Sequence, residues 1–123
     1  MDNTQILQKI SYVVIYVTDM ERSVEFYLEK LGCEILFKSD SFTHLTISGE
    51  DTKIGLHHTE KGYSGQRIST EVTFLVNNAR EDQKKLEARG VIFSRDAIEI
   101  APNTWVANFR DPDSNNLSIT SST

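Results

Sequence analysis

The chain repeats one pattern of strand-like and helix-like segments, and this repeat constrains its fold more than any other feature. A β-branched and aromatic run at residues 10–17 returns at residues 69–76, an offset of 59 residues (10 to 69). The glycine-terminated helix ends follow at an offset of 58 (28 to 86), where residues 28–32 fall on residues 86–90. A period this long with two copies indicates a duplicated supersecondary unit rather than a solenoid.

The first copy contains one helix and four strand candidates. Residues 10–17 are apolar on both faces, which is typical of a central strand covered by a helix. Thr18 and Asp19 can cap a helix at residues 20–31, and Gly32 supplies a left-handed stop. Three further strands, separated by turn-forming residues, are expected to form an antiparallel meander. We place them at residues 34–38, 42–48 and 53–59.

The second copy follows a glycine-containing linker and has the same order. Asn77 and Asn78 can cap a second short helix at residues 79–89, which Gly90 ends. Strands are predicted at residues 91–94, 98–100, 105–110 and 117–120. The sequence therefore predicts an α+β fold in a single domain over residues 1–123. Its parts are module one at about 9–59, the linker at 60–68 and module two at about 69–121.

The composition excludes several classes of function. A net charge of −5, with no basic run longer than Lys84-Lys85, argues against a nucleic-acid partner. No apolar stretch approaches the roughly 18 residues of a membrane span, and residues 1–9 lack the pattern of a signal peptide, so we expect no membrane association. A single cysteine, Cys33, cannot form an internal disulfide, which favours a cytoplasmic location. We interpret Cys33 as an inert small hydrophobe.

Four short motifs lie in an order that matches a known family. They are residues 17–23 (VTDMERS), 26–27 (FY), 31–32 (LG) and 109–115 (FRDPDSN). With the internal repeat, the chain resembles the vicinal oxygen chelate superfamily, which includes glyoxalase I, bleomycin and fosfomycin resistance proteins, and extradiol dioxygenases. The resemblance implies two βαβββ modules, with mixed curled sheets around a shared cleft, and a homodimer. Residues 111–116 also have a local explanation, because proline and the flanking Asx side chains form a reverse turn.

Metal-dependent members of this superfamily hold their ion with His or Glu side chains on four matching strands. The resemblance places these positions at Tyr12, Gly55, Glu71 and Ser118, of which Glu71 alone is an ordinary ligand for a divalent cation. The resemblance is therefore nearest to metal-lacking, bleomycin-resistance-like members, and we expect no cofactor. A slip of the strand would bring His57 into the cleft and leave His57 with Glu71 as a two-ligand remnant.

The leading hypothesis is a protein that binds a small molecule in the cleft without a metal, similar to resistance proteins that sequester an antibiotic. Its net acidity favours a cationic ligand. Aromatic side chains supply flat apolar area, and Trp105 is expected to be a wall of the cleft. Further aromatic candidates are Phe42, Tyr63 and Phe109, although core packing is the simpler explanation for Phe42 and Phe109. The predicted ligand-binding residues are Tyr12, Gly55, His57, Glu71, Trp105 and Ser118.

Two other functions stay open from the sequence. One is an enzyme of the same superfamily, either a metal-dependent lyase, isomerase or dioxygenase or an acid/base catalyst that uses Glu71 with His57 or Tyr12. In that hypothesis Glu71 is a buried general base, whereas the simpler alternative is a carboxylate hydrogen-bonded to Tyr12. The other function is a dimeric regulatory or interaction protein without catalysis.

Overall fold

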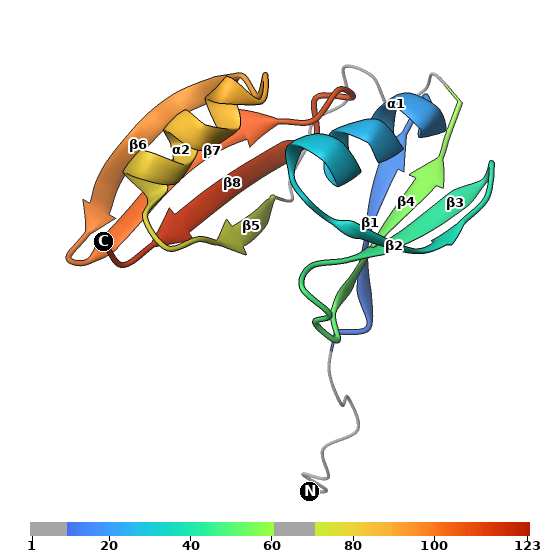
Figure 1. The fold of residues 1–123 in the computed structure, drawn as a ribbon, viewed down its shortest axis with the longest axis horizontal. Helices are drawn as coiled ribbons and strands as arrows, with labels where there is room; N and C mark the ends of the chain where they lie inside the picture. Colours follow the sequence, from blue (N-terminus) through green and yellow to red (C-terminus); the bar gives the residue numbers. More distant parts are fainter. Residues whose placement is uncertain (1–9, 61–70) are drawn as a thin grey trace, which may run out of the picture.

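The computed structural model describes residues 10–60 and 71–123, whose strands form two four-stranded sheets (Figure 1). The strands of the first sheet are β1 (Tyr12–Val17), β2 (Glu34–Lys38), β3 (Phe42–Thr46) and β4 (Lys53–His58). Those of the second are β5 (Val72–Leu75), β6 (Phe93–Ala101), β7 (Thr104–Arg110) and β8 (Asn116–Ser121). The helical elements are α1 (Met20–Glu25), a π-helical turn η1 (Phe26–Lys30) and α2 (Ala79–Ala88).

The two sheets have the same topology. Their strand orders are β1-β4-β3-β2 and β5-β8-β7-β6. In each sheet the first strand runs parallel to the last strand of its module, and the other neighbours are antiparallel. Helix α1 packs on β3 and β4, and α2 packs on β6, β7 and β8. The predicted α+β fold with two βαβββ modules is therefore confirmed.

Both helices begin and end where the sequence indicates. The side chain of Asp19 accepts a hydrogen bond from the Arg22 amide at 3.1 Å, and Asn78 caps α2 in the same way. Gly32 and Gly90 follow the helices with φ angles of 81° and 94°, the left-handed conformation that favours glycine. The first helix widens in its last turn, η1, where the Leu31 amide donates to the Phe26 carbonyl.

Two predicted strands differ from the structure. Residues 91–94 and 98–100 were expected as separate strands, but β6 runs continuously through the charged residues between them and shifts register against β7. Strand β1 was expected in the centre of its sheet and instead lies at the edge. Its apolar inner face meets the core, while Tyr12 and Tyr16 on its other face are exposed. A run that is apolar on both faces therefore need not be central in its sheet or covered on both faces.

The core lies between the helices and the inner faces of the sheets, and it forms one cluster that includes residues of both modules. Leu45 and Leu56 of the first sheet and Leu117 and Ile119 of the second are almost fully buried. Burial of such side chains contributes about 1.5–3 kcal/mol each relative to exposure. The shared cluster supports our proposal that residues 1–123 form a single domain.

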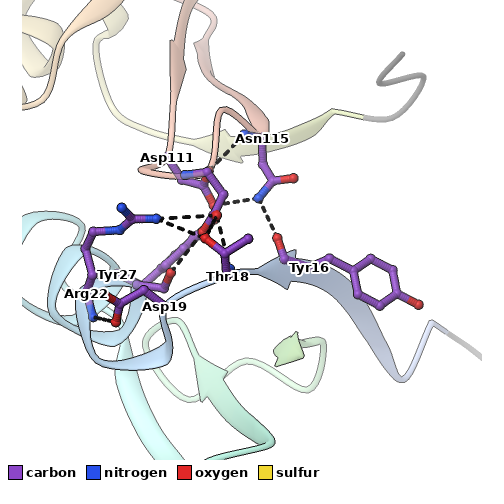
Figure 2. A network of polar contacts seen from close by, with 9 residues as sticks. Tyr16, Thr18, Asp19, Arg22, Tyr27, Asp111 and Asn115 are labelled. Atoms are coloured by element: carbon purple, nitrogen blue, oxygen red, sulfur yellow. Dashed lines mark hydrogen bonds and ion pairs between the residues drawn. The ribbon is translucent and has the colours of Figure 1, made fainter. Parts of the chain in front are cut away.

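The turn between β7 and β8, residues 111–115, joins the two modules by hydrogen bonds (Figure 2). Within the turn, Asp111 Oδ1 accepts hydrogen bonds from the amides of Asp113 and Asn115 at 2.9 and 2.8 Å, as a reverse turn requires. Its other oxygen, Oδ2, accepts a 2.8 Å hydrogen bond from the Tyr27 hydroxyl of the first module. Burial, with the neighbouring Asp111, raises the pKa of Tyr27.

Further contacts of the turn reach the start of the first helix. Asp113 accepts hydrogen bonds from the amide and the hydroxyl of Thr18 and lies 3.4 Å from the Arg22 guanidinium. Asn115 donates to the carbonyl oxygen of Tyr16 at 3.0 Å (Figure 2). The turn therefore holds the junction of β1 and α1 against the second module. The hydrogen bonds within the turn give no indication of this role.

None of the helices in the described ranges is long and apolar enough to cross a membrane. Most of the predicted linker, and with it Tyr63, lies outside the described residues.

Candidate functional site

Six aromatic and imidazole side chains form a continuous layer on the face of the first sheet opposite α1. We call this layer the ring surface. Its members are Tyr12, Tyr16, Phe37, Phe42, His44 and His57. The centroids of neighbouring rings lie 5.1–6.3 Å apart. Tyr12, Tyr16 and Phe37 are 43–50% exposed, so the layer presents its rings to the outside of the chain. An exposed apolar layer of this kind is typical of a binding surface.

Strand alternation places these rings on one face. Thr43 points toward the helix, because its hydroxyl contacts the Met20 sulfur at 3.4 Å, so its neighbours Phe42 and His44 point away from the helix. In β4, Gly55 pairs with His44 and His57 pairs with Phe42, so both lie on the same outer face. Gly55 and His57 therefore share a face, as residues two apart on a strand must.

Gly55 leaves the middle of the ring surface without a side chain of its own. A Cβ atom added at Gly55 would lie 3.2 Å from the Tyr12 ring and 3.5 Å from atoms of His44 and His57. The absence of a side chain thus lets these three rings approach one another over the strand. His57 Nε2 is buried there and has no hydrogen-bond partner within residues 10–60 and 71–123.

A second group of predicted site residues lies on the corresponding face of the second sheet. We call its residues, Glu71, Thr73, Asn108 and Ser118, the polar surface. Asn108 Nδ2 lies 3.3 Å from each oxygen of the Glu71 carboxylate, and the Thr73 and Ser118 hydroxyls are 2.8 Å apart. Asn108 Oδ1 is buried without a hydrogen-bond partner in the described part of the chain. An unpaired buried acceptor is costly, which favours a ligand that donates to it.

A cavity of about 440 Å³ opens beside Glu71 and Asn108. Arg95 and Arg110 also line it, and every lining residue belongs to the second module. Arg110 Nε donates to the side chain of Asn116 at 3.3 Å, which holds its guanidinium at the margin of the cavity. The cavity therefore combines one carboxylate, one free amide oxygen and two cationic side chains.

Trp105 lies on the opposite face of the second sheet. It shares a face of β7 with Ala107 and Phe109, which are buried against the core, and the Arg80 guanidinium lies 4.1 Å from the centroid of its ring. The structure therefore separates Trp105 from Glu71 and Ser118, contrary to its expected place in the wall of the cleft. Phe109 is 1% exposed, which agrees with core packing.

The predicted site residues thus form two groups rather than one. Tyr12, Gly55 and His57 meet on the ring surface, and Glu71 and Ser118 belong to the polar surface. The expected hydrogen bond between Tyr12 and Glu71 was wrong for one chain, because Asn108 takes the place of Tyr12 as the partner of Glu71. Glu71 is also exposed, so the single chain lacks the burial that the general-base hypothesis requires.

The side chains at the superfamily's metal-binding positions do not fit a divalent cation within one chain. Tyr12 offers only a neutral hydroxyl, and Gly55 has no side chain. The Ser118 hydroxyl is already hydrogen-bonded to Thr73. Across the two described ranges, no three His, Cys, Asp or Glu side chains gather closely enough to hold a metal ion.

Sequence reasoning did not select five members of these surfaces, namely Tyr16, Phe37, His44, Thr73 and Asn108. Asn108 is identified only by the strand register, in which it pairs with Ser118 across β7 and β8. The face of β1 on which Tyr16 lies could be predicted from the sequence, because Tyr16 is four residues after Tyr12 and so shares its face. Its exposure depends instead on whether another element covers the outer face of the first sheet, which the run itself does not indicate.

Comparison with known proteins agrees with this architecture. The sequence model described as the Glyoxalase/Bleomycin resistance protein/Dioxygenase superfamily matches residues 9–119. The uncharacterized protein YetH of Bacillus subtilis (strain 168) is 21% identical over 114 residues, which cover 89% of this chain and 94% of YetH.

Several solved structures share the fold. A superfamily member from Sphaerobacter thermophilus DSM 20745 has a TM-score of 0.78 at 22% identity, with 93% of this chain and 97% of that chain covered. TnmS3, an antibiotic binding protein from Streptomyces sp. CB03234, has a TM-score of 0.76 at 21% identity, with 94% and 97% covered. A lactoylglutathione lyase from Agrobacterium tumefaciens has a TM-score of 0.75 at 14% identity, with 94% and 95% covered. At these identities the likeness concerns the fold.

Proposed function

The chain belongs to the Glyoxalase/Bleomycin resistance protein/Dioxygenase superfamily, and we propose that it binds a small planar aromatic cation without using a metal. In this proposal the ligand lies in a cleft, with its rings on the ring surface and its cationic group beside Glu71 of the polar surface. Binding is the function itself, so the ligand is sequestered and not altered.

The ring surface is the observation that carries the proposal. Neighbouring rings with centroids 5.1–5.8 Å apart and planes tilted by 36–48° present a wide apolar area at a low entropic cost of ordering. Stacking on such a layer favours flat ligands, since a flat ligand contacts several rings at once. Gly55 supports this preference because it keeps the centre of the layer free of a protruding side chain.

The charge preference follows from the polar surface. Glu71 supplies a carboxylate, and Asn108 Oδ1 beside it is an acceptor without a partner within the described ranges. An ammonium or protonated ring nitrogen satisfies both groups at once. Arg95 and Arg110 line the same cavity, so we place any anionic substituent of the ligand on the arginine side. The net charge of −5 favours the approach of cations over longer distances.

We further propose that a second copy of the chain completes the cleft. The cavity beside Glu71 is lined by second-module residues alone, and the ring surface of the first module is exposed. A homodimer in which the ring surface of one copy faces the polar surface of its partner would enclose the ligand between them. The cytoplasm remains our proposed location, since the single cysteine cannot form an intrachain disulfide.

Sequestration is favoured over the superfamily's metal-dependent reactions by the donor set described above. Among the structural neighbours, TnmS3 is an antibiotic binding protein, so this fold supports binding of a drug. A planar cationic antibiotic is the kind of ligand that fits the two surfaces described here.

The proposal is tested by titrating the protein with proflavine, a planar aromatic cation, and with 9-anthracenecarboxylate, an anion of similar ring size. Fluorescence anisotropy of each probe and calorimetry give the two dissociation constants. We expect proflavine to bind about tenfold more tightly, because its cationic group can pair with the Glu71 carboxylate and donate to Asn108 Oδ1. Tighter binding of the anion would show that Arg95 and Arg110 decide the charge preference, and it would overturn the cationic ligand.

Three variants locate the site. Tyr12→Leu keeps apolar area but removes a ring and should weaken proflavine binding, as should Glu71→Gln, which removes the charge. Ile92→Ala is the matched control, because Ile92 is 84% exposed and belongs to neither surface. The absence of saturable binding, or equal effects of all three variants, would overturn the proposal and favour an interaction protein. Mass spectrometry of the recovered probe should show it unchanged, and a chemically altered probe would favour an enzyme.

A further inference from the structure

A second cavity, of about 430 Å³, lies between the two modules on the helix side of the second sheet. We propose that this cavity is a separate binding site for a single-chain amphiphile with a carboxylate head, of the class of medium-chain fatty carboxylates. Its volume is within the range of ligand pockets.

The lining changes from apolar to charged between the floor and the mouth. The floor consists of Cys33, Phe109 and Ile119, each no more than 3% exposed. Half-buried apolar side chains form the walls, and they come from both modules: Leu31 of the first and Phe74, Val76 and Leu86 of the second. The exposed side chains of Lys85 and Arg89 lie at the mouth.

The charges at the mouth indicate the head group. Lys85 in the last turn of α2 and Arg89 at its C-cap lie four residues apart and therefore project from the same side of the helix end. The Arg89 guanidinium also donates to the Lys30 carbonyl at 3.1 Å, which holds it beside the first module. Asp82 is the acidic residue among the lining side chains, and it is 3.7 Å from the Lys85 ammonium in a solvent-exposed pair that contributes little energy. Two cations against one carboxylate leave a net positive mouth on a protein whose net charge is −5. The Asp82 carboxylate already accepts a hydrogen bond from the Asn78 amide and pairs with Lys85, so the mouth favours an anionic head over a cationic one.

The cavity lies on the opposite face of the second sheet from the proposed cleft, although Phe109 lines both cavities. Phe109 and Ile119 point toward α2, whereas Asn108 and Ser118, their neighbours in β7 and β8, belong to the polar surface on the opposite face of the sheet. A ligand in this cavity therefore touches neither the ring surface nor Glu71. It would instead contact both modules at once and favour their present arrangement.

Decanoate and the neutral decanol are the probes, and the 14.0 kDa chain suits NMR of labelled methyl groups. Saturable decanoate binding should shift the methyl signals of Ile47, Leu86 and Ile119, which line the cavity, but not that of Val14 on the outer face of β1. Decanol should bind about fivefold more weakly, because it lacks the charge that Lys85 and Arg89 attract.

Two variants and one control make the outcome decisive. Lys85→Glu should weaken decanoate binding about fivefold and leave decanol unchanged, whereas Lys84→Glu, on the adjacent exposed residue outside the cavity lining, should affect neither. Val76→Phe should fill the cavity and weaken both probes. Equal binding of decanoate and decanol would overturn the carboxylate preference, and shifts at Val14 instead of Ile47 would overturn the location.

The alkylation rate of Cys33 provides an independent readout in the unmodified protein. Burial raises the pKa of the Cys33 thiol to about 11, so its reaction with iodoacetamide at pH 8.5 is slow but measurable. Saturation with decanoate should slow the reaction further, because the ligand covers the floor of the cavity. A rate that decanoate leaves unchanged would contradict occupation of this cavity, whatever the result of the proflavine titration.

Discussion

Gly55 lies in the middle of the ring surface, where a side chain at this position would change what the surface can bind. The neighbouring Tyr12 and His57 rings approach it because it has no side chain, and its backbone φ is not in the left-handed region. The glycine is therefore required by space above the strand and not by backbone conformation. The resemblance implies that metal-dependent relatives have a metal ligand at this position. Glycine here therefore lacks a donor atom and also leaves space above the strand.

A graded series at Gly55 tests this interpretation. Gly55→Ala places a methyl group 3.2 Å from the Tyr12 ring, and Gly55→Val adds further bulk. Proflavine affinity should fall moderately in the first variant and about tenfold in the second, because the planar ligand can no longer rest on the rings. Urea denaturation should show a change of about 1 kcal/mol or less for Gly55→Ala, since the exposed Tyr12 side chain can rotate away. Unchanged affinity in both folded variants would contradict the ring surface as the site.

Trp105 shows why single residues were harder to place than elements. The sequence indicates correctly that Trp105 begins a strand after a turn. The side of the sheet that it faces depends on the register between β7 and β8, where Ser118 pairs with Asn108 and not with Trp105. A shift of one residue exchanges the two faces of a strand, and no local pattern around Trp105 fixes that register.

At the scale of elements, the turn at residues 111–115 connects the second module to the first, in addition to reversing the chain between β7 and β8. Asp111 and Asp113 contact Tyr27 and Thr18, which lie more than 80 residues earlier in the chain. The local hydrogen bonds of the turn already explain the proline and Asx residues, so the sequence contains no further signal for these long-range contacts.

The helices and most strands could be predicted because their signals are local. Capping side chains and terminal glycines fix the helix ends, and β-branched runs mark the strands. Strand β6 was divided in the prediction because Arg95 and Asp96 interrupt its apolar pattern, although the strand continues through them beside β7. The edge position of β1 depends on its pairing with β4, about 40 residues away, and such pairing is not a local property.

The Asp111 carboxyl group predicts a pH dependence of stability. Burial raises its folded-state pKa above the ordinary value, against the opposing effect of its hydrogen-bond donors. At a pH between the pKa values of Asp111 in the unfolded and the folded chain, the folded chain holds a proton that the unfolded chain has lost. The stability that this proton contributes is complete below the ordinary aspartate pKa of about 3.9 and decreases as the pH rises through the folded-state pKa. The stability of the wild type relative to Asp111→Asn should therefore increase as the pH falls from 7 toward 4.

Urea denaturation of both proteins across this pH range measures the effect, provided that each remains folded at zero denaturant. Asp40→Asn is the matched control, because it removes one exposed carboxylate outside the turn. A stability difference between the wild type and Asp111→Asn that grows in favour of the wild type toward neutral pH would contradict the raised pKa of Asp111.

At the scale of the whole molecule, the duplicated modules carry complementary surfaces. The first module offers rings and an apolar face, and the second offers a carboxylate, an amide and two guanidinium groups. Each surface resembles half of a binding site, and in the described chain the cavity beside Glu71 has no residue from the first module. Duplication followed by divergence of the two sheet faces would therefore produce a site that needs both modules, whether they come from one copy or from two.

Complementation between two defective variants distinguishes these arrangements. Tyr12→Leu impairs the ring surface and Glu71→Gln the polar surface, so a cleft shared between two copies has one intact example in every mixed dimer. After subunit exchange in an equal mixture, about a quarter of all clefts should bind proflavine with wild-type affinity, because half of the dimers are mixed and each has one intact cleft. Calorimetry of the mixture measures this fraction, with each variant alone as the control and analytical ultracentrifugation to verify the dimer. A folded monomer, or a mixed dimer in which no high-affinity fraction returns, would show instead that each chain builds its cleft from its own two modules.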